Sequence, residues 1–469
     1  MPETLSAPAV QELAAAFRGS LLQPGENGYE EARLVWNGLH DRHPALIASC
    51  ATPDDVVAAV NFAREAGLVV AVRGGGHSAP GYATCDDGIV IDLSPMKAID
   101  VDPVAKTARA EAGLTWGEFD LATQAHGLAV TGGRFSTTGI AGLTLGSGSG
   151  WLERKCGLTA DNLLSAEIVT AAGERVTASA DENSDLFWGI RGGSGNFGVV
   201  TSFEYRLHDV GPIIYGGMLL SLPERAADIL KFVSDYMPSA PEDLGGGVAF
   251  INAPPEPFVP ADLQHQPAVG VVICWTGDHD EGERVVAPIR EVAQPVVDMV
   301  QAMPYTALQS MLDAGGPKGI RGYFKAEFMD ALDDEAIAKL VQHGARRAGP
   351  MAQLLLEPMR GAISRTGEDA TALGRRDVAW CYHALAMWME PDPETAEAHV
   401  AWARALAEDL DEHSTDGVYL NYISEHEEER IRSTFGPKYD RLVALKNRYD
   451  PDNMFRLNQN IRPSANGRG

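Results

Sequence analysis

Residues 68–78 read LVVAVRGGGHS, a short apolar run that leads directly into three glycines and a histidine. The apolar run predicts a buried strand. Consecutive glycines permit positive φ, so successive backbone N–H groups can turn toward an anion, with Arg73 adding charge and Ser78 a hydroxyl donor. From these residues alone, two interpretations stay open. The loop is either an anion-binding loop with a functional His77, or a tight turn with an incidental histidine.

A second glycine-rich stretch favours the first interpretation. Residues 137–151, TTGIAGLTLGSGSGW, hold five glycines in fifteen positions, and Arg191-Gly192-Gly193 follows later. Glycines inside a strand cost stability and usually mark a close approach by backbone or ligand. Together the stretches predict a long ligand, such as a dinucleotide, lying against bare backbone.

Two common nucleotide motifs are excluded by their context. Residues 193–198, GSGNFG, fit the GxGxxG pattern, but the β-branched run of residues 199–205 follows where a dinucleotide-binding helix should begin. Neither glycine-rich loop ends in the GK[ST] of a phosphate-binding P-loop. We therefore expect no nicotinamide dinucleotide to bind.

Composition and charge limit the partners. A length of 469 residues predicts two or three domains. The 45% of hydrophobic and 22% of charged residues are typical of globular proteins. A net charge of −27 disfavours nucleic acid and anionic membranes as partners. The five cysteines form no CxxC pair, so we expect reduced thiols and neither a disulfide framework nor a metal site. No apolar run suits a membrane span, and the first residues lack a secretory pattern, so we expect a cytoplasmic protein.

The glycine content and the predicted secondary structure of the chain change near residue 209. Up to that point it is glycine-rich with short predicted strands, including residues 89–93, 166–171 and 199–205. Thr52 followed by Pro53 predicts the start of a helix, and residues 172–174 are expected to form the turn of a hairpin between residues 166–171 and 175–177. Beyond it, helical segments alternate with strand-like runs, which predicts helices backing an antiparallel sheet. The helices are expected at Ala226–Tyr236, Asp280–Val292, Asp334–Arg347 and Thr395–Leu410, and the clearest strands at Ala268–Trp275 and Val378–Met389.

Seven motifs in order resemble a known family. The sequence is similar to the berberine-bridge-enzyme-like group of FAD-linked oxidases in the vanillyl-alcohol oxidase superfamily, which includes hydroxynicotine oxidases and glucooligosaccharide oxidases. The motifs are Arg73–Ser78, Gly139–Trp151, Arg154–Asn162, Asp185–Trp188, Gly195–Val200, Tyr419–Tyr422 and Asn458–Ile461.

The resemblance implies an α+β fold with a two-part FAD-binding domain. Residues 1–209 and 418–469 would form that domain, and residues 210–417 would be an inserted substrate domain, an antiparallel sheet covered by helices. The family's histidine bonds to the flavin 8α-methyl group, and His77 stands in its place. Phe135 replaces the cysteine that makes a second bond in some members, so FAD is expected to be linked through His77 only. The predicted cofactor-binding residues are His77, Arg73, Gly74, Gly75, Gly76, Ser78, Thr138, Gly139, Gly142, Leu143, Asn162, Gly198, Val199, Val200, Asn458 and Asn460.

Three residues are the catalytic candidates. Glu357 stands in the apolar run LLLEPM, where burial would raise the pKa of its carboxyl toward that of a useful base. An ion-paired or exposed strand residue is the alternative. Tyr422 matches a tyrosine that acts as a base or substrate partner in relatives, and Tyr382 stands where some members place a carboxylate. His383 is a less favoured pocket residue, with Tyr323, Lys325 and Trp388.

The resemblance implies a function as well. It predicts an FAD-dependent oxidase that takes a hydride from a small organic substrate and reoxidises with molecular oxygen to give hydrogen peroxide. Alcohols, sugars, amines and polyketide-like molecules are all open as substrates. The alternatives are a flavin dehydrogenase that uses another electron acceptor and a non-catalytic flavin-binding protein.

Overall fold

The LVVAVRGGGHS segment runs through the edge strand of a small sheet. The computed structural model describes residues 5–415, 417–425 and 428–464. Its first sheet has the order β1 (Ser20–Leu22), β2 (Leu46–Ser49), β4 (Ile89–Asp92) and β3 (Val70–Arg73). β2, β4 and β3 are parallel, and β1 pairs antiparallel with β2. β3 ends at Arg73, so the glycine loop begins at the carboxyl end of a parallel strand.

The helix between β2 and β3 starts where the sequence predicts. Thr52 caps α3 (Pro53–Glu65) by accepting from the Asp55 backbone N–H, and the Asp55 side chain completes a capping box. This helix packs its apolar face into the first hydrophobic core and so fixes the position of β3 and its loop.

The second sheet is antiparallel. Its order is β5 (Ile99–Asp102), β6 (Thr107–Glu111), β10 (Val199–Arg206), β8 (Leu163–Val169) and β9 (Arg175–Ser179). β8 and β9 form the predicted hairpin. β10 begins at Val199, so a strand and not a helix follows the GSGNFG segment, as predicted.

The second glycine-rich stretch differs from the expectation of a strand. Residues Ile140–Leu145 form the short helix α5, which begins after Gly139. Ile140 and Thr144, one turn apart, are fully buried, and the Thr144 hydroxyl donates to the Ile140 carbonyl. Burial of this helical face outweighs the low helix propensity of the glycine it contains.

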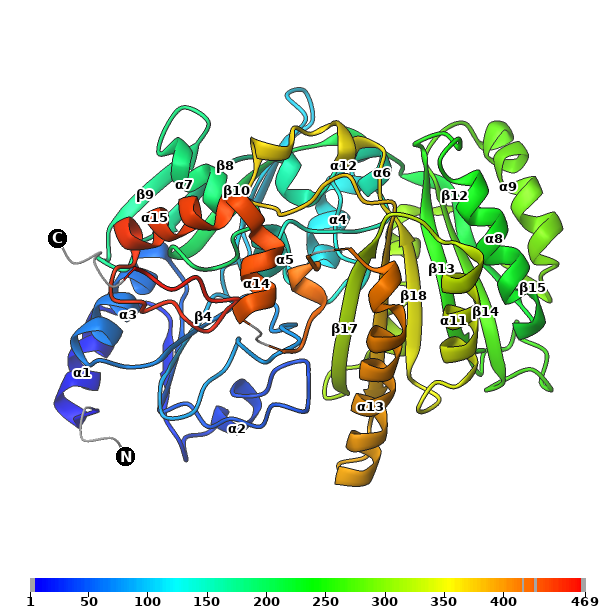
Figure 1. Cartoon of the computed structure of the whole chain (residues 1–469). Helices are drawn as coiled ribbons and strands as arrows, with labels where there is room; N and C mark the ends of the chain where they lie inside the picture. The colour runs from blue at the N-terminus through cyan, green and yellow to red at the C-terminus, as the bar shows by residue number, and fades with distance from the viewer. Residues whose placement is uncertain (1–4, 416, 426–427, 465–469) are drawn as a thin grey trace.

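The third sheet carries the helices on one face (Figure 1). It is antiparallel, with the order β15 (Val297–Asp298), β12 (Ile213–Ser221), β14 (Pro267–Trp275), β13 (Leu244–Asn252), β18 (Gln353–Pro358), β19 (Trp380–Trp388) and β17 (Arg321–Met329), and β16 (Gln301–Pro304) also pairs with β12. The covering helices are α8 (Ala226–Tyr236), α9 (His279–Ala293), α11 (Asp334–Ala345) and α13 (Pro393–Leu410). The predicted antiparallel sheet with helices is therefore confirmed.

The two faces of the third sheet have different roles. Leu356 and Tyr382 belong to the hydrophobic core beneath the helices. Glu357 and His383, each the next residue of its strand, face the opposite side. Because side chains alternate along a strand, a shift of one residue decides which side chains reach the site.

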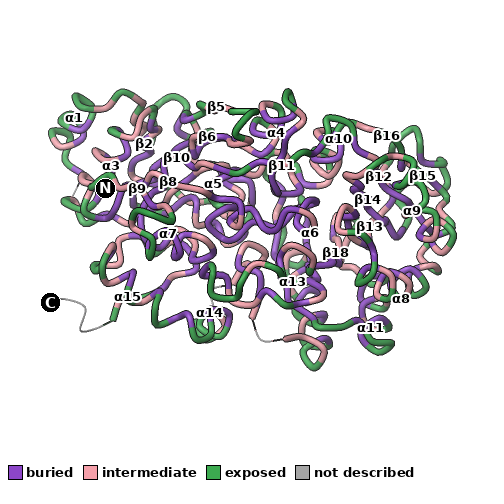
Figure 2. Tube along the Cα trace, turned by 90° about the horizontal axis from the view of Figure 1, so that it is seen from above, coloured by how far each residue is buried: buried purple, intermediate pink, exposed green. Residues whose placement is uncertain are grey.

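The C-terminal segment returns to the first core. η6 (Leu420–Tyr422), α14 (Glu428–Phe435) and α15 (Tyr439–Tyr449) lie beside the N-terminal half, and Leu442 and Phe455 are buried in its core (Figures 1 and 2). The division at residues 209 and 417 stays a prediction. The remaining α-helices and strands are α1 (Ala7–Ala16), α2 (Tyr29–Ala32), α4 (Trp116–Gln124), β7 (Leu128–Ala129), α6 (Glu153–Cys156), α7 (Ser184–Ile190), β11 (His208–Asp209), α10 (Tyr305–Gln309) and α12 (Ala362–Arg365).

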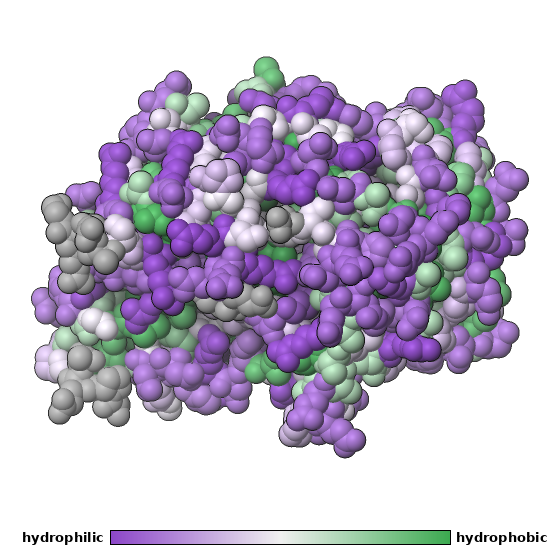
Figure 3. Space-filling view, in the orientation of Figure 1, coloured by the Kyte–Doolittle hydropathy of each residue, from purple (hydrophilic) through white to green (hydrophobic). Residues whose placement is uncertain are grey.

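The surface and the cysteines agree with the composition. The face shown in Figure 3 is mostly hydrophilic, as expected for a globular protein with a net charge of −27. All five cysteines lie in the described part of the chain, buried and unpaired. No helix among the described residues has the length and apolar character that crossing a membrane needs.

Candidate active site

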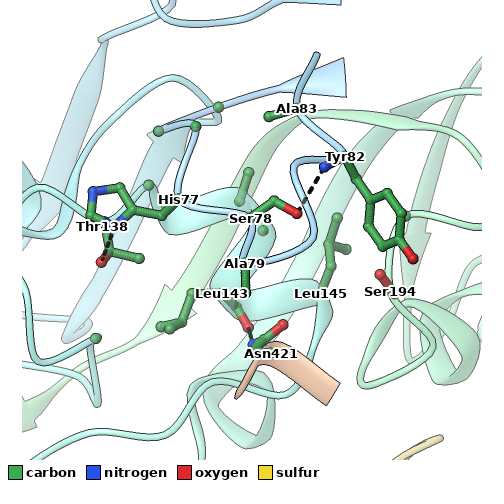
Figure 4. A pocket seen from close by; sticks show the side chains of 18 of the residues that line it. His77, Ser78, Ala79, Tyr82, Ala83, Thr138, Leu143, Leu145, Ser194 and Asn421 are labelled. Carbon is green, nitrogen blue, oxygen red and sulfur yellow. Dashed lines mark hydrogen bonds between the residues drawn. The ribbon is translucent and has the colours of Figure 1, made fainter. Parts of the chain in front are cut away.

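One cavity lies between the glycine-rich loops and the third sheet, on the face of the sheet opposite its helices. Most of its lining comes from four parts of the chain: residues 74–83, residues 133–149, residues 194–200 and the C-terminal segment around Tyr422 and Asn458. Strands β17, β18 and β19 form a further wall through Phe324, Leu355, Glu357, His383 and Leu385. Figure 4 shows His77 and Thr138 on one side of this cavity and Tyr82 and Ser194 on the other.

The glycines are needed for two reasons. Gly75 and Gly139 bring their backbones into contact, since a Cβ on either would come within 2.2 Å of the backbone nitrogen of the other. At Gly142 and Gly195 an added Cβ would meet nothing within 4 Å, because the space beside them is the cavity itself. The first pair lets the two loops meet, and the second pair leaves room for a ligand against the backbone.

His77 is held as a neutral ring at the cavity wall. Its imidazole stacks on Trp36 with 4.8 Å between the ring centroids, and its Nε2 lies 3.0 Å from the Thr137 hydroxyl. The Thr138 hydroxyl lies 3.4 Å from Nδ1. Burial lowers the pKa of His77 to about 3. A neutral imidazole keeps a nitrogen lone pair, which is what bond formation to carbon requires.

The opposite side suits the flavin dinucleotide that the resemblance implies. Asn458 donates to the carbonyl oxygens of Gly195 and Phe455, but its Oδ1 is buried with no hydrogen-bond partner in the described structure. Gln459 Oε1 is likewise buried with no hydrogen-bond partner in the described structure. Buried acceptors without partners are rare in native proteins, so a ligand with donors fits here.

A buried cluster of charges stands at the sheet wall. Arg134 contacts two carboxylates, with its Nη1 3.0 Å from Glu357 Oε1 and its Nη2 3.1 Å from Glu153 Oε1. Nη1 also donates to the Tyr422 hydroxyl oxygen at 2.6 Å and to Ser149 Oγ at 3.0 Å. The three charged side chains are each at most 5% exposed.

Two carboxylates share one guanidinium in this cluster, and that sets its acid–base behaviour. Burial raises the pKa of Glu357 to about 7, the charge of Arg134 lowers it, and Glu153 raises it again. Tyr422 has a pKa well above its usual value, mainly because it is buried. Glu357 is therefore poised to exchange a proton near neutral pH, whereas Tyr422 stays protonated.

His383 stands beside this cluster. Its ring stacks on Tyr422 at 4.0 Å between centroids and 6° between planes. Phe324 meets it edge-on at 5.7 Å. Burial, followed by the charge of Arg134, lowers the pKa of His383 to about 3.

The structure brings together most of the residues predicted from the sequence. Those that line the cavity are His77, Gly74, Gly75, Gly76, Ser78, Thr138, Gly139, Gly142, Leu143, Gly198, Val199, Val200, Asn458, Glu357 and Tyr422. Ser78 also closes its own loop by accepting from the Tyr82 backbone N–H at 3.1 Å, as Figure 4 shows.

Three predicted cofactor residues lie outside the cavity lining. Arg73 pairs with Asp92 at 3.0 Å and faces a neighbouring cavity on the other side of the glycine loop. Asn162 donates to the carbonyl oxygens of Cys156 and Leu158, so it ties down its own loop. Asn460 does not line the cavity, although Asn458 does. The part of these three in binding the cofactor stays a prediction.

The catalytic role predicted for Tyr382 has to be corrected. Its side chain is fully buried on the helix-covered face of the third sheet, opposite the cavity. The adjacent residue, His383, occupies the cavity face instead.

Sequence reasoning missed Arg134 and Glu153. Arg134 stands in TGGRF, residues 131–135, where a single charge follows two glycines among uncharged residues. An arginine in such surroundings is rarely buried without carboxylate partners. The composition of TGGRF therefore indicates that Arg134 has carboxylate partners, but the sequence does not show that these are Glu153 and Glu357.

Two known families match parts of the chain. Residues 44–179 match the FAD binding domain family, and residues 418–462 match the berberine and berberine like family. (R)-6-hydroxynicotine oxidase of Paenarthrobacter nicotinovorans is 31% identical, over 96% of this chain and 98% of that protein.

Solved structures show the same fold. The crystal structure of 6-hydroxy-D-nicotine oxidase from Arthrobacter nicotinovorans has a TM-score of 0.87 and 29% identity, covering 98% of this chain and all of that one. Glucooligosaccharide oxidase from Acremonium strictum, at 23% identity and a TM-score of 0.85, covers 97% of this chain and 99% of that one and supports the fold alone. The chain is thus an FAD-binding oxidoreductase and belongs to the berberine-bridge-enzyme-like FAD-linked oxidases of the vanillyl-alcohol oxidase superfamily.

Proposed function

We propose that this enzyme oxidises a small organic molecule at a carbon that bears a hydroxyl or amino group, with oxygen as the final electron acceptor and hydrogen peroxide as a product. The observation that carries the proposal is one cavity lined both by the glycine loop with His77 and by the acid–base cluster of Glu357. FAD, when bound, supplies the hydride acceptor and the reaction with oxygen. The remaining tasks belong to side chains of the chain itself.

Binding of the cofactor rests on the loops around His77. We propose that His77 forms the single covalent bond to the flavin through a ring nitrogen. The neutral state of His77 supports this, because a protonated imidazole has no free lone pair. Phe135 lines the cavity where doubly linked relatives have a cysteine, and its side chain cannot form a second bond. Thr137 and Thr138 would orient the ring through their hydroxyl groups.

Proton transfer is assigned to Glu357. The reaction removes a hydride from carbon and a proton from the neighbouring oxygen or nitrogen, and Glu357 accepts that proton in its ionised form. Arg134 keeps the carboxylate in place and compensates its charge. Tyr422 accepts a hydrogen bond from Arg134, so its own O–H remains available to a substrate oxygen or nitrogen.

The cytoplasm is the proposed location. Five unpaired cysteines suit a reducing compartment. The net charge of −27 disfavours a nucleic-acid or anionic membrane partner, so a small molecule and oxygen are the expected partners.

Two measurements test the proposal. Protein precipitated with acid should keep its yellow colour, and a peptide containing His77 should carry the mass of one flavin. Flavin released entirely into the supernatant, or bound to a cysteine, would refute the linkage through His77. Holoenzyme reduced under nitrogen should reoxidise rapidly in air with one peroxide per flavin. Slow reoxidation with fast transfer to an artificial acceptor would identify a dehydrogenase instead.

A further inference from the structure

The ring of His77 is held by an indole and a hydroxyl group. It lies on the indole of Trp36, with 4.8 Å between the ring centroids and 18° between the planes. Its Nε2 lies 3.0 Å from the Thr137 hydroxyl. The stack fixes the plane of the ring, and the hydroxyl fixes its rotation within that plane. Nδ1 lies 3.4 Å from the hydroxyl of Thr138, which lines the cofactor cavity (Figure 4).

Trp36 is itself fixed by a different part of the chain. Its indole Nε1 donates to the Gly316 carbonyl oxygen at 2.8 Å, and its backbone carbonyl accepts from the Gly319 N–H at 2.9 Å. The residue is 6% exposed and packs with Phe324 of β17. The plane of the indole is therefore set by contacts that do not involve His77.

A second cavity lies on the other side of the glycine loop. Its volume is about 570 Å³, far more than the ~10–15 Å³ that one water molecule needs. Trp36 and His77 line both cavities, so the indole covers a ring that water could otherwise reach. Burial, and not the charge of a neighbouring group, lowers the pKa of His77 to about 3. The charged residues that line the second cavity are Glu31, Arg73, Asp92, Asp313 and Lys318.

Covalent attachment makes two demands on His77. In this step a bond forms between a ring nitrogen and the 8α-carbon of the flavin, and a C–H bond of that methyl group breaks. Two protons leave, one from the C–H and one from the imidazole N–H. Two electrons pass into the flavin, and oxygen takes them up with two protons to give hydrogen peroxide. The attacking nitrogen must carry its lone pair and must point at the methyl group, so the ring has to be neutral and oriented.

We infer that Trp36 is a positioning residue for the covalent attachment of FAD, because its indole holds the His77 ring in the attacking orientation and keeps water from its face. The inference rests on the proposed linkage through His77. Trp36 acts through that ring and forms no bond to the flavin. Because Trp36 is held by Gly316 and Phe324, attachment should also require that β17 is packed against the glycine loops.

The test follows covalent attachment in time. Full-length protein produced in riboflavin-starved cells is mixed with FAD, and samples are precipitated with acid to measure the flavin that stays with the protein. Total bound FAD is measured before precipitation by ultrafiltration. We expect Trp36→Leu to attach FAD about two- to tenfold more slowly than the wild type, the factor by which a stacked aromatic pair typically favours one orientation. Total binding should be unchanged.

The pH dependence separates positioning from a general weakening of the fold. The wild-type ring stays neutral between pH 5.5 and pH 7.5, because the pKa of His77 is about 3. In Trp36→Leu water reaches the ring, and its pKa rises toward the ~6.5 of an exposed histidine. The ratio of the variant rate to the wild-type rate should therefore fall by up to about tenfold as the pH is lowered from 7.5 to 5.5.

Two further variants serve as controls. Trp36→Phe keeps a ring that can stack, so it should attach FAD within about twofold of the wild-type rate. Trp388→Leu removes an equally large buried side chain from the helix-covered face of the third sheet and should attach FAD at the wild-type rate. If Trp36→Leu does not fold, Trp36→Met replaces it, because its flexible side chain adapts to the space without stacking.

Several outcomes would overturn the inference. They are an unchanged attachment rate in Trp36→Leu, a rate ratio that does not change with pH, an equal loss in Trp36→Phe or in Trp388→Leu, or the loss of all FAD binding in both Trp36→Leu and Trp36→Met. Failure of the proposed function would look different. A wild-type protein that binds FAD but never attaches it contradicts the linkage through His77, whatever the variants do.

Discussion

Replacing Glu357 by glutamine tests the acid–base assignment most directly. Glutamine keeps the size of the side chain and a hydrogen-bonding group, but it cannot take a proton. The buried cluster should tolerate the change. In the wild type one guanidinium faces two carboxylates, and in the variant Arg134 still pairs with Glu153 at 3.1 Å. The variant should therefore fold and carry flavin as the wild type does.

The expected loss is large. Removing a general base typically slows a reaction by ~10²–10⁴, or about 3–5 kcal/mol of barrier. The flavin reduction rate should fall by that order in anaerobic stopped-flow with the substrate that a peroxide screen identifies. Reoxidation by oxygen should be unchanged, because Glu357 is assigned to the substrate's proton alone.

The pH dependence gives a second, independent readout. Glu357 accepts a proton only when ionised, and burial raises its pKa to about 7. The wild-type reduction rate at low substrate concentration should therefore rise with pH, by about tenfold between one unit below and one unit above that pKa. Glu357→Gln should show no such rise in this window.

Tyr422→Phe decides between the two candidate bases. It removes the hydroxyl that Arg134 contacts and keeps the ring that stacks on His383. We expect weaker substrate binding and a retained pH profile. If Tyr422→Phe abolishes reduction while Glu357→Gln reacts normally, the tyrosine is the base and the reasoning from the pKa of Glu357 fails.

Three further substitutions follow from the structure. Glu153→Gln removes a charge that raises the pKa of Glu357, so the pH profile of flavin reduction should move to lower pH; an unmoved profile would contradict the coupling. Tyr382→Phe should change the reduction rate by less than about twofold, since its side chain faces away from the cavity; a large loss would restore it as a catalytic candidate. Asp120→Asn tests a fully buried carboxyl whose pKa burial raises from 3.8 to about 8. Its protonated form is favoured by folding, so wild-type stability should fall as pH rises between these values, by up to about 1.4 kcal/mol per unit. In melting-temperature scans from pH 5 to pH 9, the variant should lose less than the wild type; equal slopes would exclude the effect.

Much of the fold could be predicted from local signals. The Thr52 cap with its following proline marked the start of α3, and apolar periodicity placed α8 and β14 within a residue or so of their observed ends. The β-branched run at Val199 was enough to exclude a dinucleotide-binding helix. Each of these signals lies within a few residues of the element that it predicts, which is why sequence alone sufficed.

The face of β19 that meets the cavity could not be predicted in the same way. Tyr382 and His383 are adjacent, and a strand in a covered sheet is apolar on both faces, so composition does not distinguish inside from outside. Only the register, with Leu355 opposite His383 and Leu356 opposite Tyr382, sets which side chain lies on the face of Glu357. That register depends on pairing between strands whose order the sequence does not reveal.

The acid–base cluster depends on parts of the chain that are far apart. Arg134 and Glu153 come from the N-terminal half, Glu357 from the third sheet and Tyr422 from the C-terminal segment, 288 positions beyond Arg134. A spacing rule cannot detect such a set.

The arrangement also has a physical consequence, because the pKa of Glu357 reflects burial against the other parts as well as two neighbouring charges. If the third sheet moved away from the glycine loops, water would reach the carboxyl and its pKa would fall toward that of an exposed glutamate. A proton acceptor tuned to neutral pH therefore exists only while the sheet is packed against the glycine loops, so a substitution at that contact should shift the pH profile even when it lies outside the cavity.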